Sequence, residues 1–75
     1  MTATDVREFH FVLTLQRHGG TTGTYRGTIN LGPGATRSGA FDHLRSEFCR
    51  DQGWSPDAVN VLFFSLELNS LDGAR

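Results

Sequence analysis

The sequence predicts a two-layer α+β domain, in which one helix packs on one face of a three-stranded antiparallel sheet, and three patterns indicate this fold class. Two runs of alternating apolar and polar residues, joined by a glycine-containing loop, are typical of an antiparallel hairpin. A later segment repeats its apolar residues at helical spacing. The most continuous apolar run, VNVLFFSLEL, follows that segment and favours a buried strand. The predicted order is therefore β-β-α-β.

The hairpin is expected to consist of strands at Phe9–Arg17 and Thr24–Leu31. Every second residue of the first run is apolar, which is the pattern of a half-buried strand. The segment from His18 to Gly23 contains three glycines, and glycine readily adopts the positive φ that tight turns require. One face of the hairpin is therefore expected to be apolar, through Phe9, Phe11, Leu13, Leu15, Tyr25 and Ile29.

The helix is expected to begin at Thr36 or Ser38, since either side chain can cap its first turn. It is expected to end at Asp51 or Gln52, with Gly53 as the residue that terminates it. Its apolar residues form one stripe, which we expect to cover the apolar face of the sheet: Ala40, Phe41, Leu44 and Phe48.

The third strand is expected at Val59–Leu68, after a turn at Ser55-Pro56-Asp57. A right-handed crossover places it beside the first strand, which gives the spatial order 2-1-3 with all neighbours antiparallel. Alternation along this strand predicts that one set of side chains faces the helix, namely Leu62, Phe64, Leu66 and Leu68. Val61 and Phe63 are then expected on the opposite face.

The sheet face without a helix is the candidate functional surface. Val12, Val61 and Phe63 are expected to form an apolar cluster there, beside an exposed edge strand. The polar residues expected around this cluster are His10, Arg26 and Glu67. Exposed apolar edges favour association unless something covers them. We therefore expect a protein-interaction module that forms a homodimer through this face or the edge strand, with another protein partner as a possibility.

Length, net charge and composition limit the possible functions and locations of the protein. A chain of 75 residues is expected to be one domain, with an ordered core at about 8–69 and loose tails at 1–7 and 70–75. The net charge of -1 argues against a general nucleic-acid binder, so an accessory role on DNA or RNA through Arg17 and Arg26 is the alternative. All seven basic residues are arginine, as a GC-rich bacterial genome would encode. One cysteine, no signal sequence and no membrane-length apolar run indicate a cytoplasmic protein that does not enter a membrane.

No residue pattern indicates catalysis or a cofactor. The histidines and Cys49 include no closely spaced pair, so no metal site is expected. Cys49 borders the apolar stripe of the helix, which favours a structural thiol over a nucleophile. The segment from Leu31 to Arg37 connects a strand to the start of a helix; a plain turn is favoured there over a weak anion site. The protein is therefore not expected to be an enzyme.

Overall fold

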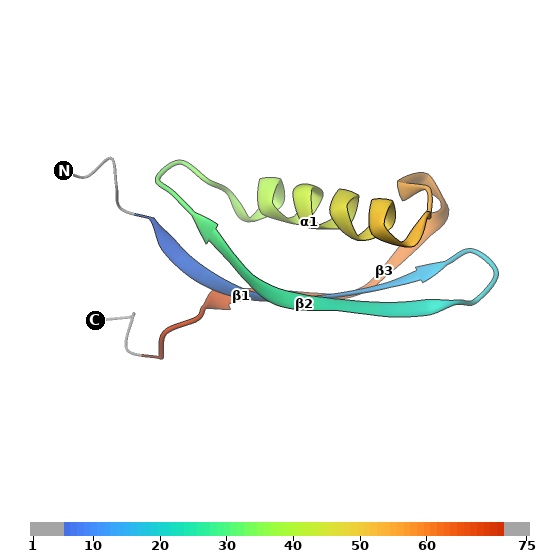
Figure 1. Cartoon of the computed structure of the whole chain (residues 1–75), viewed down its shortest axis with the longest axis horizontal. Helices are drawn as coiled ribbons and strands as arrows, with labels where there is room; N and C mark the ends of the chain where they lie inside the picture. The colour runs from blue at the N-terminus through green and yellow to red at the C-terminus, as the bar shows by residue number, and fades with distance from the viewer. Residues whose placement is uncertain (1–5, 72–75) are drawn as a thin grey trace.

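A computed structural model describes residues 6–71, which form a three-stranded sheet with one helix along one of its faces (Figure 1). The elements are β1 (Arg7–Arg17), β2 (Thr22–Leu31), α1 (Arg37–Gln52), a short 3-10 helix η2 (Pro56–Ala58) and β3 (Val59–Leu68). The predicted fold class, the element order and the spatial order β2-β1-β3 are confirmed. The predicted loose tails lie largely outside the described residues, although β1 already begins at Arg7.

The central strand β1 pairs with β2 and β3, and both pairings are antiparallel. Leu13, for example, lies opposite Tyr25 of β2 and opposite Phe64 of β3. Residues that lie opposite one another share a face of the sheet. Most of the apolar residues of the three strands therefore gather on the side that the helix covers, and Val12 and Phe63 lie on the other side.

The ends of α1 are fixed by the caps that the sequence predicts. The Oγ1 atom of Thr36 accepts a hydrogen bond from the backbone N–H of Gly39 at 3.0 Å, which satisfies one of the free amides of the first turn. Gly53 adopts a left-handed conformation, with φ of 74°. The backbone N–H of Trp54 then donates to the carbonyl of Cys49 at 2.8 Å, which ends the helix.

The core lies between β1 and α1. Leu13, Leu15, Leu44 and Cys49 are almost completely buried. A row of aromatic rings continues this core toward the hairpin, with Tyr25 and Phe48 separated by 5.5 Å and Phe48 and Trp54 by 5.5 Å between ring centroids. Gly23 of β2 gives the rings room, because a Cβ atom there would lie 3.0 Å from Cζ of Phe48.

The predicted alternation along β3 is wrong at one point. Thr14 pairs with Phe63, but its neighbour Leu15 pairs with Val61, so Leu62 has no partner in the register. Such a β-bulge adds one residue to a strand and shifts its alternation. Val61 therefore lies on the helix side of the sheet, opposite Leu15, and not on the uncovered face. Leu62, which we expected beneath the helix, is instead 53% exposed.

Candidate protein-interaction surface

The face of the sheet turned away from α1 is covered by no other part of residues 6–71 (Figure 1). We call it the open face. The register assigns to it alternate residues of each strand, with the bulge taken into account: Glu8, His10, Val12, Thr14 and Gln16 of β1, Thr22, Thr24, Arg26, Thr28 and Asn30 of β2, and Asn60, Phe63, Ser65 and Glu67 of β3.

Four of the residues predicted for the interface lie together on the open face. Val12 is half-buried at the centre, between Arg26 of β2 and Ser65 of β3. His10 is the next residue of β1 on this face, and it lies opposite Glu67. An apolar centre is thus bordered by side chains of both charge signs, an arrangement that allows contact with another protein surface.

Phe63 also lies on the open face, opposite Thr14, and is 54% exposed. The hydroxyl groups of Thr14 and Thr24 are hydrogen-bonded to each other at 3.0 Å. The surface beside Phe63 is therefore polar, but its two hydroxyl groups already have each other as hydrogen-bond partners. A partner protein can therefore cover these two threonines without removing the hydrogen bond between their hydroxyls.

The bulge concentrates exposed apolar side chains on β3. Val61, Leu62 and Phe63 are consecutive and are 45%, 53% and 54% exposed. We call these three residues the β3 patch. Because β3 is an edge strand, the patch adjoins backbone that is not paired with a further strand of the sheet. The sequence could not show that Leu62 belongs to the patch, since a bulge becomes visible only in the pairing.

The edge of β3 is partly protected just beyond the patch. The Nη2 atom of Arg37 donates to the carbonyl of Phe64 at 3.4 Å, and its guanidinium carbon lies 4.7 Å from the centroid of the Phe64 ring. A charged side chain placed over an edge strand hinders pairing with another strand. Arg37 therefore protects the edge at Phe64 and leaves the edge at the patch uncovered.

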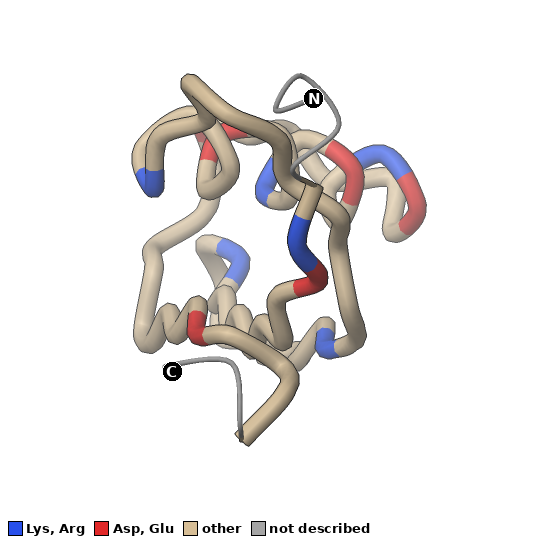
Figure 2. Tube along the Cα trace, turned by 90° about the vertical axis from the view of Figure 1, so that its left-hand side faces the viewer, with Lys and Arg blue, Asp and Glu red and all other residues tan. Residues whose placement is uncertain are grey.

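The arginines of the alternative nucleic-acid site do not come together. Arg26 lies on the open face opposite Val12, whereas the alternation of β1 places Arg17 at the end of the helix-side face, opposite Val59. Figure 2 shows basic and acidic positions distributed around the chain rather than gathered in one stripe. A nucleic-acid backbone is typically bound by a continuous basic surface, which these two residues do not form.

Two groups on the helix side of the sheet, the thiol of Cys49 and the hydroxyl of Tyr25, have raised pKa values. Burial raises the pKa of the Cys49 thiol, which reduces the fraction of reactive thiolate. Burial and the neighbouring Glu47 raise the pKa of Tyr25, whose hydroxyl donates to that carboxylate at 3.4 Å. Within residues 6–71, no three His, Cys, Asp or Glu side chains are grouped as metal ligands would be.

No helix in the described part of the chain has the length and apolar character needed to cross a bilayer. Comparison with known proteins found no matching family model, no significantly similar curated protein and no significantly similar solved structure.

Proposed function

We propose that this protein is a non-enzymatic interaction module that forms a homodimer through the β3 patch and the adjoining open face. The observation that carries the proposal is the run of three consecutive apolar side chains, each about half exposed, on an edge strand. The buried thiol of Cys49 supports a non-enzymatic role, because burial raises its pKa and a thiol with a raised pKa is a poor nucleophile. A single cysteine, which cannot form an internal disulfide, also fits a cytoplasmic location.

The physical reason for association is the cost of leaving this surface in water. Apolar surface contributes roughly 25 cal/mol for each Å² that is buried, and aromatic side chains contribute most. A domain of this size has a small core and a small stability margin, so burial of further apolar surface by a partner is a substantial gain.

A second copy of the chain fits the surface for two reasons. A two-fold axis brings a patch against the same patch of the partner, so apolar Phe63 and Leu62 meet apolar groups without any further complementarity. The open face also carries both charge signs around Val12, through Arg26 and Glu67. Two such faces therefore do not repel each other as two faces of one sign would.

An NMR dilution series on the full chain tests the location of the interface. We expect the backbone amide signals of the β3 patch and of Val12 to shift between dilute and concentrated samples, while those of Leu44 in the helix remain fixed. The Leu62→Thr variant keeps strand propensity and removes apolar surface, so its shifts should appear only at higher concentration. Signals that are independent of concentration at the patch, or that shift on the helix instead, would place the interface elsewhere.

A further inference from the structure

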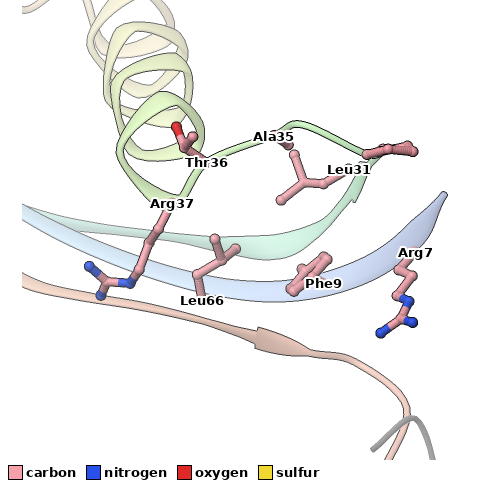
Figure 3. Close-up of a pocket in the computed structure, with 9 residues that line it drawn as sticks. Arg7, Phe9, Leu31, Ala35, Thr36, Arg37 and Leu66 are labelled. Atoms are coloured by element: carbon pink, nitrogen blue, oxygen red, sulfur yellow. The ribbon is translucent and has the colours of Figure 1, made fainter. Parts of the chain in front are cut away.

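A cavity of about 430 Å³ lies between the start of α1 and the end of the sheet where β1 begins and β2 ends. In Figure 3, Phe9, Leu31 and Leu66 occupy its middle, while Arg7 and Arg37 lie at its two ends. Small-molecule pockets have volumes of about 300–1,000 Å³, with mainly apolar walls and a few polar groups. The cavity has both properties.

The cavity exists because the sheet extends further than the apolar stripe of the helix. Phe41 is the first large apolar residue of α1, and its ring packs on Phe64 with 5.1 Å between centroids. Leu66, two residues further along β3, packs against the core and also lines the cavity, whereas Phe9 and Leu31 lie outside the core cluster. The loop with Gly32-Pro33-Gly34 spans the gap but brings no large side chain over it.

The charges at the cavity are of one sign. None of the residues that line it is acidic. Within residues 6–71, neither Arg7 nor Arg37 forms an ion pair with a carboxylate, whereas Arg45 and Arg50 each do. Arg37 is also held in place, by its hydrogen bond to the carbonyl of Phe64 and its stacking on that ring. A guanidinium has five N–H donors, so this single bond leaves donors for an anion.

We propose that the cavity binds a small amphipathic carboxylate. Its apolar chain would lie on Phe9, Leu31 and Leu66, and its carboxylate would accept hydrogen bonds from the guanidinium of Arg37. The amide of Gly39 in the first turn of α1 is occupied by Thr36, so the anion is bound by arginine and not by that amide. The cavity lies on the helix side of the sheet, and this binding is independent of association through the β3 patch.

An NMR titration of the full chain with octanoate tests the proposal, and octanol serves as the neutral ligand of similar shape. Octanoate should shift the amide signals of Phe9, Leu31 and Leu66 along a saturating curve. Octanol should bind about fivefold more weakly, since it lacks the charge that pairs with Arg37. Equal affinities for the two ligands, no saturable shifts, or shifts confined to other residues would overturn the proposal.

Two variants locate the binding site. Arg37→Gln should remove the preference for octanoate over octanol, whereas Arg17→Gln, a control at the opposite end of β1, should keep it. Ala35→Phe should block both ligands by filling the cavity, and it leaves the arginines unchanged. If Arg37→Gln retains the preference, or if Ala35→Phe binds octanoate as the natural chain does, the site is not this cavity.

Discussion

Replacement of Phe63 by threonine should dissociate the proposed homodimer without unfolding the chain. Phe63 is 54% exposed in the isolated chain. A phenylalanine side chain has an accessible area of about 200 Å², so about 110 Å² remains available for burial by a partner. At roughly 25 cal/mol per Å², this area corresponds to about 2.7 kcal/mol for each copy.

Threonine keeps part of the apolar surface, so the net loss is about 2 kcal/mol for each copy and about 4 kcal/mol for a two-fold dimer. A change of 1.4 kcal/mol is tenfold in Kd, and the dimer Kd should therefore rise by roughly a thousandfold. Sedimentation equilibrium of both chains measures this change directly. Threonine has high strand propensity, so the far-UV circular dichroism spectrum should be unchanged.

Val6→Thr is the matched control for this experiment. Val6 has the same exposed fraction, 54%, but precedes β1 and lies outside the β3 patch. Its replacement should leave the dimer Kd within about twofold of the natural value, as expected for a residue outside an interface. A Kd within that range for Phe63→Thr as well would refute the proposed interface, because Phe63 would then remain exposed in the dimer.

Three further predictions concern the fold. Gly23→Ala should lower the free energy of unfolding, measured by urea titration, by about 1–3 kcal/mol, because its Cβ would lie 3.0 Å from Phe48. Gly27→Ala is the control: its Cβ would make an ordinary 3.6 Å contact, so the free energy of unfolding should fall by less. Thr36→Ala should cost about 1 kcal/mol through loss of the helix cap, and Thr36→Ser should restore most of it. Burial raises the pKa of Cys49, so its contribution to stability is complete below the pKa of the unfolded thiol, about 8.5, and is lost as pH rises through the folded pKa. Cys49→Ala should therefore lose less stability than the natural chain between neutral and alkaline pH, and identical losses would contradict this assignment.

Most of the fold was predictable because local patterns and the tertiary structure agree. The alternation of β1, the apolar stripe of α1 and the helix caps at Thr36 and Gly53 each occur where the sequence predicts them. Strand order followed from the handedness of a single crossover. These features depend on neighbouring residues or on one general rule of connection.

The features that the sequence did not predict depend on pairing between distant residues. The bulge arises because Thr14 and Leu15 pair with Phe63 and Val61, and no residue within VNVLFFSLEL indicates which position is extra. Only the paired structure reveals that Leu62 is exposed and that Val61 leaves the open face. The cavity combines residues from β1, β2, α1 and β3, and no single segment of the sequence contains that combination.

Self-association is the central claim, and the solution mass tests it most directly. Light scattering on the eluate of a sizing column should be recorded over a concentration series of the natural chain. The mass of one chain is 8.3 kDa, and we expect the measured mass to rise with concentration to a plateau at twice that value. A mass that stays at that of one chain at every concentration would contradict the account, since the β3 patch would then remain exposed to water.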